Sequence, residues 1–311
     1  MTKAVFLINP LSHTVLKKGS VLEAAAKTSN TPVFNLDPFD NLDTIVSQAF
    51  DNKTELVFIE GGDGTVQGIL SAFLAHKTKA PLPKFVLLPG GMTNLVAKHV
   101  GVKKPNVSKV LSLLNADSNK TTTLLPLLNI AYEKHMFSGF LFSTGALPIA
   151  TKYCHEKIFS LGINGVSAVR ATLLRVLFGR GEAREIILSP TPMILEIDGI
   201  KVEDGHILTL STTLSSLMIG LNPFWGTGDG AVKISHLRGG GKRFIRNVFR
   251  FLKSKQSETS KNKLARDGFR SWSVDTATMH YSGPLVLDGE FLPQTKKPIR
   301  LSASVPLSFI K

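Results

Sequence analysis

The fold is decided by the stretch Leu56-Val57-Phe58-Ile59-Glu60-Gly61-Gly62-Asp63-Gly64-Thr65. Its first four residues form a continuous apolar run, which predicts a fully buried strand. Glycines then dominate, and residues 65–74 have the spacing of a helix. Glycine lets a backbone approach a ligand closely, and free N–H groups at a helix N-terminus favour phosphate. The stretch therefore predicts a strand, a phosphate-binding loop and a helix.

The carboxylate of Asp63 lies in the middle of this loop. It would repel a bare phosphate, but hard cations take carboxylate and phosphate oxygens together. The loop therefore predicts a site for a nucleotide with Mg²⁺. Thr65 can add a hydroxyl donor or cap the helix. The structural alternative is an ordinary tight turn between strand and helix.

Strand and helix patterns alternate through the first third of the chain. Predicted strands are 4–8, 33–34, 56–59 and 85–88, and predicted helices are 13–26, 41–50, 65–74, 94–100 and 107–114. This alternation predicts a parallel sheet covered on both faces.

A second glycine loop, Pro89-Gly90-Gly91-Met92-Thr93-Asn94, follows the next strand and also precedes a helix. In a parallel sheet, the loops at the strand C-termini lie on one edge. We therefore expect both glycine loops and Asn9-Pro10 to line one crevice. The chain has no Walker-type motif, and no Gly-x-Gly-x-x-Gly follows its first strand, which disfavours P-loop enzymes and dinucleotide dehydrogenases.

The pattern changes near residue 122, where shorter apolar runs separated by turn residues predict an antiparallel β domain. The predicted strands include 186–188, 193–197, 207–210, 272–274 and 285–287. Helical insertions are predicted at 166–177 and 243–252, and the polar stretch 253–266 reads as a mobile loop.

The chain carries 37 Lys and Arg against 23 Asp and Glu, a net charge of +14. This excess favours nucleotides, nucleic acid or anionic lipid surfaces without choosing among them. The single cysteine, Cys154, excludes an intrachain disulfide. We find no signal peptide and no apolar run long enough to span a membrane, which predicts a cytoplasmic protein.

These motifs resemble those of the diacylglycerol kinase catalytic-domain family, which includes sphingosine and ceramide kinases. The glycine loop is the family signature, which NAD kinases share and phosphofructokinases share loosely. The other matching segments are Asn9-Pro10-Leu11-Ser12, Pro89–Asn94 and Leu287-Asp288-Gly289-Glu290. The resemblance is strongest in residues 1–100 and 285–290.

The resemblance implies a Rossmann-like parallel α/β domain at 1–122, which the end segment 294–311 joins. It implies an antiparallel β-sandwich domain for the lipid substrate at 123–293. ATP and substrate would meet in the cleft between the two domains.

The resemblance also implies roles for individual residues. ATP would be bound by Asn9, Pro10, Gly61, Gly62, Asp63, Gly64, Thr65, Gly91, Thr93 and Asn94. The metal ligands would be Asp63 and Asp229. Asp288, with Glu290 as second choice, would accept the proton of the lipid hydroxyl, although Asp-Gly is also typical of a type I′ hairpin turn.

The lipid substrate would be reached at an anionic membrane surface. Two basic amphipathic segments, 165–179 and 241–255, could contact it, or could pack on the β domain instead. We do not expect nucleic-acid binding, because no known motif accompanies the charge. A homodimer is one option for the oligomeric state.

Two further functions stay open. An NAD kinase-like enzyme would share the glycine loop. A non-catalytic nucleotide- or lipid-binding relative would explain the departures from the family pattern at His13, Met92 and Leu95.

Overall fold

The computed structural model describes residues 3–37, 39–91, 94–115, 122–153, 182–217, 222–239, 244–251 and 257–311. The chain divides into two compact units, which we describe separately. Unit 1 comprises Met1–Leu127 and Ser304–Lys311, and unit 2 comprises Leu128–Ala303. The sequence-based boundaries were placed after residues 122 and 293.

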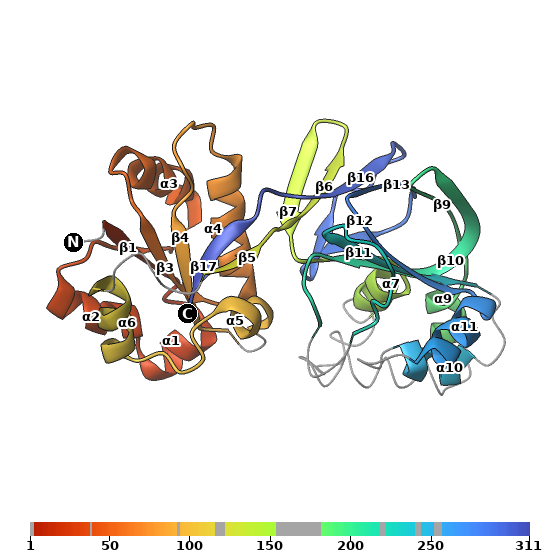
Figure 1. Cartoon of the computed structure of the whole chain (residues 1–311), viewed down its shortest axis with the longest axis horizontal. Coiled ribbons are helices and arrows are strands. Elements are labelled where there is room, and N and C mark those ends of the chain that lie inside the picture. The colour runs from red at the N-terminus through yellow and green to blue at the C-terminus, as the bar shows by residue number, and fades with distance from the viewer. Residues whose placement is uncertain are drawn as a thin grey trace. The chain divides into compact units, whose positions relative to one another are not determined.

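Unit 1 is built on a six-stranded sheet with the order β2-β1-β3-β4-β17-β5 (Figure 1). Its strands are β1 (Ala4–Ile8), β2 (Val33–Asn35), β3 (Leu56–Gly61), β4 (Lys84–Pro89), β5 (Thr122–Leu125) and β17 (Leu307–Ile310). All neighbouring pairs are parallel except β17 and β5. The expected Rossmann-like parallel sheet is thus confirmed.

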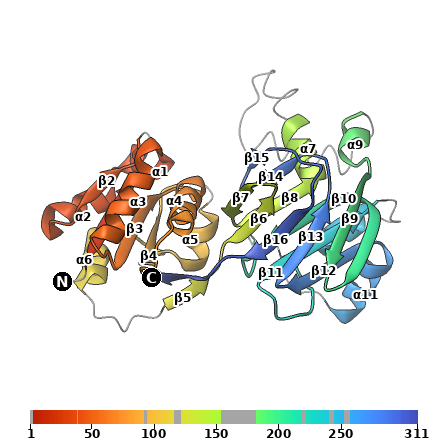
Figure 2. The same cartoon turned by 90° about the horizontal axis from the view of Figure 1, so that it is seen from above.

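Helices cover both faces of this sheet (Figure 2). They are α1 (His13–Lys18), α2 (Val21–Ser29), α3 (Leu42–Asp51), α4 (Asp63–Ala75), α5 (Leu95–Val100) and α6 (Val107–Asn115), with a 3₁₀ turn at Phe39–Asn41. Apolar residues of α1, α2 and α6 pack with Phe6, Phe58 and Val86 in one core cluster. On α4, the ring of Phe73 packs edge-on against Phe85 of β4.

The single helix predicted at 13–26 is wrong, because the chain forms two helices there. Gly19 has a φ of 77°, which a continuous right-handed helix does not allow. Ser20 then caps the second helix, since its side chain accepts the N–H of Glu23.

Unit 2 is an eleven-stranded antiparallel sheet that curls around its core. Its strands are β6 (Leu128–Tyr132), β7 (His135–Gly139), β8 (Leu141–Gly145), β9 (Thr191–Ile197), β10 (Ile200–Thr212), β11 (Val232–Arg238), β12 (Phe269–Val274), β13 (Thr276–His280), β14 (Leu285–Leu287), β15 (Glu290–Leu292) and β16 (Ile299–Ala303). The long strand β10 pairs with β9 along its first half and with β8 and β11 along its second half. The predicted antiparallel β domain is confirmed.

Within the described residues of unit 2, the helices are α7 (Ala146–Tyr153), α9 (Glu182–Ile187), α10 (Phe244–Phe251) and α11 (Glu258–Arg266). The strand predicted at 186–188 is wrong, since residues 186 and 187 form the last part of α9. The mobile loop predicted at 253–266 is also wrong for residues 258–266. There, Ser257 caps α11 by accepting the N–H of Ser260, and Leu264 is fully buried. The helix predicted at 166–177 lies outside the described residues.

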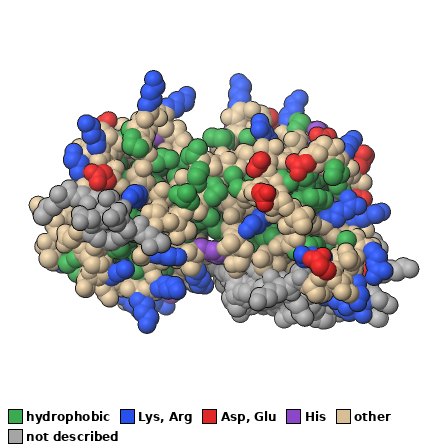
Figure 3. All heavy atoms as spheres, in the orientation of Figure 1, with side chains coloured by type: hydrophobic (Ala, Val, Ile, Leu, Met, Phe, Trp, Pro, Cys, Tyr) green, Lys and Arg blue, Asp and Glu red, His purple; other side chains and the backbone are tan. Residues whose placement is uncertain are grey.

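No helix in the described part of the chain is long and apolar enough to cross a membrane. On the face shown in Figure 3, Lys and Arg side chains are spread over the surface and do not gather in one stripe.

Two buried histidines lie in the core of unit 2. The ring of His206 stacks on that of His236 at 5.9 Å between centroids, and it lies edge-on to Tyr281. Hydroxyls of Thr144 and Thr191 lie within hydrogen-bond distance of the two ring nitrogens of His206. Burial lowers the pKa of His206 to about 4. Burial, together with the positive charges of protonated His206 and of Arg270, lowers the pKa of His236 to about 3. Both imidazoles are therefore neutral in the folded protein near neutral pH.

This burial predicts a loss of stability in acid. Below pH 6.5 the unfolded chain binds protons at these histidines, whereas the folded chain does not until about pH 4. The free energy of unfolding should therefore fall as the pH is lowered from 6.5 to 4, by on the order of 3 kcal/mol for each histidine. Urea unfolding at pH 7 and pH 4.5 measures the fall. His206→Gln should show a smaller fall than the unmodified protein, while replacement of the exposed His13 by Gln should leave it unchanged. An equal fall in all three proteins would contradict the assignment.

Candidate functional site

The candidate site lies at the carboxyl edge of β1 and β3 in unit 1. Strand order reverses between these two strands, because β2 lies on one side of β1 and β4 lies on the far side of β3. Such a switch point opens a crevice outside the strand ends, where open α/β sheets bind ligands. The main-chain N–H of Asn9 donates to the carbonyl of Glu60 at 3.0 Å, so the ends of the two strands are joined.

Asn9 fixes the start of α4 to the end of β1. Its Nδ2 donates to the Thr65 hydroxyl at 2.8 Å, and its Oδ1 accepts the N–H of Leu11 at 2.9 Å. Thr65 is buried. The predicted residues Asn9 and Thr65 are therefore brought together, and Pro10 follows in the same turn.

The two glycine loops touch through their backbones. The N–H of Gly90 donates to the carbonyl of Gly61 at 2.8 Å. A Cβ added at Gly90 would lie 2.8 Å from the Cα of Gly61, and one added at Gly91 would lie 2.7 Å from the Cα of Gly62. Side chains cannot fit at these distances. These glycines are thus required by the packing of the chain itself.

Gly64 differs from its neighbours. A Cβ added there would meet nothing within 4 Å, and its backbone does not have a positive φ. It is exposed and lies in the first turn of α4. No contact within the described chain therefore requires a glycine at this position, which leaves room for the close approach of a ligand.

The N-terminus of α4 has no side-chain cap. Its N-cap residue is Gly62, which has no side chain to accept a hydrogen bond. The first N–H groups of a helix need partners from outside the helix, and its dipole favours an anion there. With the space beside Gly64, this end of α4 fits a phosphate group.

The carboxylate of Asp63 caps a neighbouring helix. Its Oδ1 accepts the N–H of Val96, in the first turn of α5, at 3.2 Å. Asn94, with a φ of 50°, closes the second glycine loop: its Oδ1 accepts the N–H of Gly91 at 2.8 Å and its Nδ2 donates to the Gly91 carbonyl at 2.6 Å. The predicted residue Thr93 lies outside the described residues, as does Met92.

Glu60 is an important residue that the sequence reasoning missed. Its carboxylate accepts the hydroxyl of Ser20 at 2.5 Å and the N–H groups of Val21 and Leu22 at 3.0 Å each, and it is only 4% exposed. It thereby caps α2. The sequence signal that could have identified Glu60 was its position, as a charged residue at the end of a predicted buried strand and directly before the glycines.

The Asp-Gly-Glu segment forms a two-residue hairpin turn between β14 and β15 in unit 2. Leu287 pairs with Glu290, and the φ angles of Asp288 and Gly289 are 50° and 97°. The two carboxylate oxygens of Asp288 accept the N–H groups of Phe140 and Leu141, at 2.9 and 2.8 Å. Asp288 thus anchors the β7–β8 turn, while Glu290 is exposed.

Asp229 is exposed, between two glycines that pack on β12. A Cβ added at Gly228 would lie 2.2 Å from the Ser273 carbonyl oxygen, and one at Gly230 would lie 1.9 Å from the Val274 carbonyl carbon. Within the described residues, no three His, Cys, Asp or Glu side chains gather to hold a metal ion. At the glycine loop Asp63 therefore offers a single carboxylate, which fits a metal ion that is bound mainly through phosphate oxygens. A metal ion at Asp229 stays a prediction.

Comparison with protein families matches residues 3–126 to the diacylglycerol kinase catalytic domain. Comparison of the sequence with curated proteins gives no significant match. The resemblance predicted from the motifs is thus confirmed for the part of the chain that holds the candidate site.

The chain also resembles solved structures at 14% sequence identity. A diacylglycerol kinase from Bacillus anthracis str. Sterne has a TM-score of 0.63, over 99% of this chain and 96% of that one. Two further structures are of a candidate diacylglycerol kinase from the same strain. One has a TM-score of 0.66, over 99% of this chain and 96% of that one. The other has a TM-score of 0.64, over 96% of this chain and 94% of that one. At this identity the likeness establishes a shared two-domain fold.

The backbone contact between the loops predicts that Gly90→Ala destabilises unit 1. The new Cβ would meet the backbone of Gly61, which cannot move without displacing β3, so the loss should be about 1–3 kcal/mol. Gly68→Ala on α4 is the control, since its Cβ would meet only a ring atom of Phe39 at 3.8 Å. Urea unfolding would contradict this packing if both variants were as stable as the unmodified protein.

Proposed function

We propose, from the match of residues 3–126 to the diacylglycerol kinase catalytic domain, that the chain is an ATP-dependent lipid kinase. It would transfer phosphate to the hydroxyl of a diacylglycerol-like lipid. The observation that carries the proposal is the uncapped N-terminus of α4 beside the open space at Gly64, at the switch point of the sheet.

The phosphates of ATP would be held by backbone N–H groups of Gly62–Thr65. Phosphoryl transfer depends on positioning and charge neutralisation more than on covalent chemistry. A bound Mg²⁺ would neutralise charge on the phosphates. The carboxylate of Asp63 could hold this ion, directly or through water, and its bond to Val96 fixes its position. Asn9 would keep Thr65 and the start of α4 in place.

The general base for the lipid hydroxyl would come from the Asp288–Glu290 turn. Both oxygens of Asp288 already accept backbone N–H groups, whereas Glu290 is exposed. We therefore assign the base to Glu290 and the anchoring of the turn to Asp288. This reverses the order suggested by the motif alone.

Membrane contact through α10 would rely on charge more than on an apolar face. Phe251 is buried and Val248 is half-buried, and both pack in a core cluster of unit 2. Asn247 is fully buried and donates to the Asp267 carboxylate. Arg246 is exposed. The segment predicted at 165–179 lies outside the described residues.

Gly64 provides the sharpest test of ATP binding. Gly64→Ala should weaken ATP binding at least about tenfold, because a methyl group would fill the space we assign to phosphate. It should not destabilise the fold, since alanine favours helix by about 1 kcal/mol over glycine. Gly68→Ala on the same helix is the matched control. Calorimetric titration with ATP and Mg²⁺ measures the affinity, and equal affinity in both variants would rule out phosphate at Gly64.

Asp63→Ala should abolish phosphate transfer, while loss of its bond to the N–H of Val96 should lower stability by only about 1 kcal/mol and leave the chain folded. Transfer of radiolabelled phosphate from ATP to diacylglycerol, a sphingoid base, ceramide or NAD measures activity and separates a lipid kinase from an NAD kinase. Replacement of the exposed Asp37 by Ala is the control. Unchanged activity of Asp63→Ala would exclude its role. ATP binding without transfer to any acceptor would instead identify a non-catalytic relative.

A further inference from the structure

Phe39 is an exposed aromatic side chain at the same edge of the sheet as the candidate site. It is 38% exposed, which makes it the most exposed phenylalanine in the described part of unit 1. It begins the 3₁₀ turn Phe39–Asn41, which lies between β2 and α3. Because β2 runs parallel to β1, with Asn35 opposite Ile8, the chain leaves β2 at the edge where the glycine loops lie.

The ring of Phe39 packs on the second turn of α4. A Cβ added at Gly68 would lie 3.8 Å from Cε1 of this ring, which is ordinary van der Waals contact. Gly64 lies on the same face of the helix, because residues four apart are neighbours on a helix surface. It is about 6 Å nearer the N-terminus along the axis. This strip of α4 therefore has no side chain between Phe39 and the proposed phosphate site.

Another side of the first turn of α4 is occupied by α5. The carboxylate of Asp63 accepts the N–H of Val96 there at 3.2 Å. At Gly64, in contrast, an added Cβ would meet nothing within 4 Å. A nucleotide whose phosphates lie at the start of α4 therefore has open space beside Gly64, on the face that carries Phe39.

The charge of this segment favours the uncharged end of a nucleotide. Residues 35–52 include four aspartates and no lysine or arginine. Asp40, directly after Phe39, is exposed. These carboxylates repel phosphate groups. The base of a nucleotide is uncharged near neutral pH, and aromatic side chains stack on it.

We propose that Phe39 is the surface on which the base of the nucleotide stacks. This inference rests on the proposed function and extends it from the phosphates to the base. The ribose would lie over the strip from Gly64 to Gly68, and the base would lie on the exposed face of the ring. Stacking on one ring accepts every base and varies with stacking strength, so it favours purines over pyrimidines without separating adenine from guanine.

Calorimetric titration of the full-length protein with ATP and with inorganic tripolyphosphate, each with Mg²⁺, separates the base from the phosphates. Phe39→Leu removes the ring and keeps an apolar side chain. It should weaken ATP binding about tenfold and leave tripolyphosphate binding unchanged. Phe39→Tyr keeps the ring and should bind ATP as tightly as the unmodified protein. UTP should lose less affinity than ATP in Phe39→Leu. Circular dichroism checks that the variants fold.

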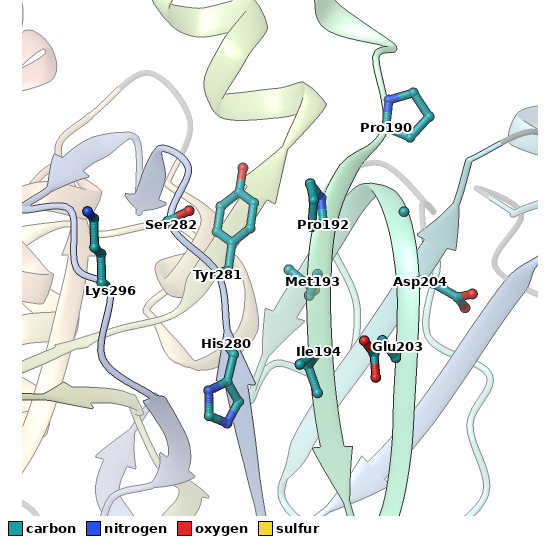
Figure 4. Close-up of a pocket in the computed structure, with 11 residues that line it drawn as sticks. Pro190, Pro192, Met193, Ile194, Glu203, Asp204, His280, Tyr281, Ser282 and Lys296 are labelled. Atoms are coloured by element: carbon teal, nitrogen blue, oxygen red, sulfur yellow. The ribbon is translucent and has the colours of Figure 1, made fainter.

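A control for the location of the nucleotide lies in unit 2. Lys296 there lines a cavity of about 610 Å³ over β9, β10 and β13, a volume that could also accept a small molecule (Figure 4). Lys296→Gln should leave the affinity for ATP unchanged. A loss equal to that of Phe39→Leu would count against the base site in unit 1.

Two results with Phe39→Leu would overturn the inference while the proposed function stands. One is unchanged affinity for ATP. The other is an equal loss of affinity for ATP and tripolyphosphate, which would show that the ring acts on the phosphate loop and not on the base. If the unmodified protein bound neither ligand, the proposed function would fail, and the base site would fail with it.

Discussion

The candidate site depends on the direct backbone contact between two glycine loops. Gly61 and Gly90 lie so close that a methyl group does not fit between them, and a hydrogen bond joins them. This contact extends the pairing of β3 and β4 beyond the strands, since Gly61 and Pro89 are the last partners of the ladder. It thereby fixes the points at which α4 and α5 begin. In this arrangement the carboxylate of Asp63, at the start of α4, accepts the N–H of Val96 at the start of α5.

Helix N-termini in unit 1 are satisfied in different ways. The first turn of α2 receives the carboxylate of Glu60, and that of α5 receives the carboxylate of Asp63. Helix α4 begins at Asp63 itself, and its N-cap residue, Gly62, provides no side-chain cap. Each N-terminus attracts an anion through its free N–H groups and its dipole. The chain thus supplies carboxylates to the starts of α2 and α5, whereas the start of α4 has no side-chain cap and lies beside the open space at Gly64, which is the physical basis for proposing a phosphate there.

Much of the local structure around the candidate site could be predicted from neighbouring residues in the sequence. The apolar run before Gly61 and the glycines after it predicted a strand, a loop and a helix, because buried strands and glycine turns are determined by neighbouring residues. The partners of Glu60 and Asp63 could not be predicted, since they lie 33 to 40 residues away in the chain. Helix α11 was missed because its polar composition hides one buried residue, Leu264, and a capping serine.

The use of carboxylates in unit 2 follows a related rule. Asp288 has the motif position of a catalytic base, but the chain uses both its oxygens to hold the N–H groups of Phe140 and Leu141. A carboxylate that is held in this way is well suited to fixing a turn. Its neighbour Glu290 has the same chemistry, is exposed, and pairs through its backbone with Leu287, so its position is set by the hairpin while its side chain is accessible. The motif therefore divides into an anchoring acid and an available acid, which is why we assign proton transfer to the second.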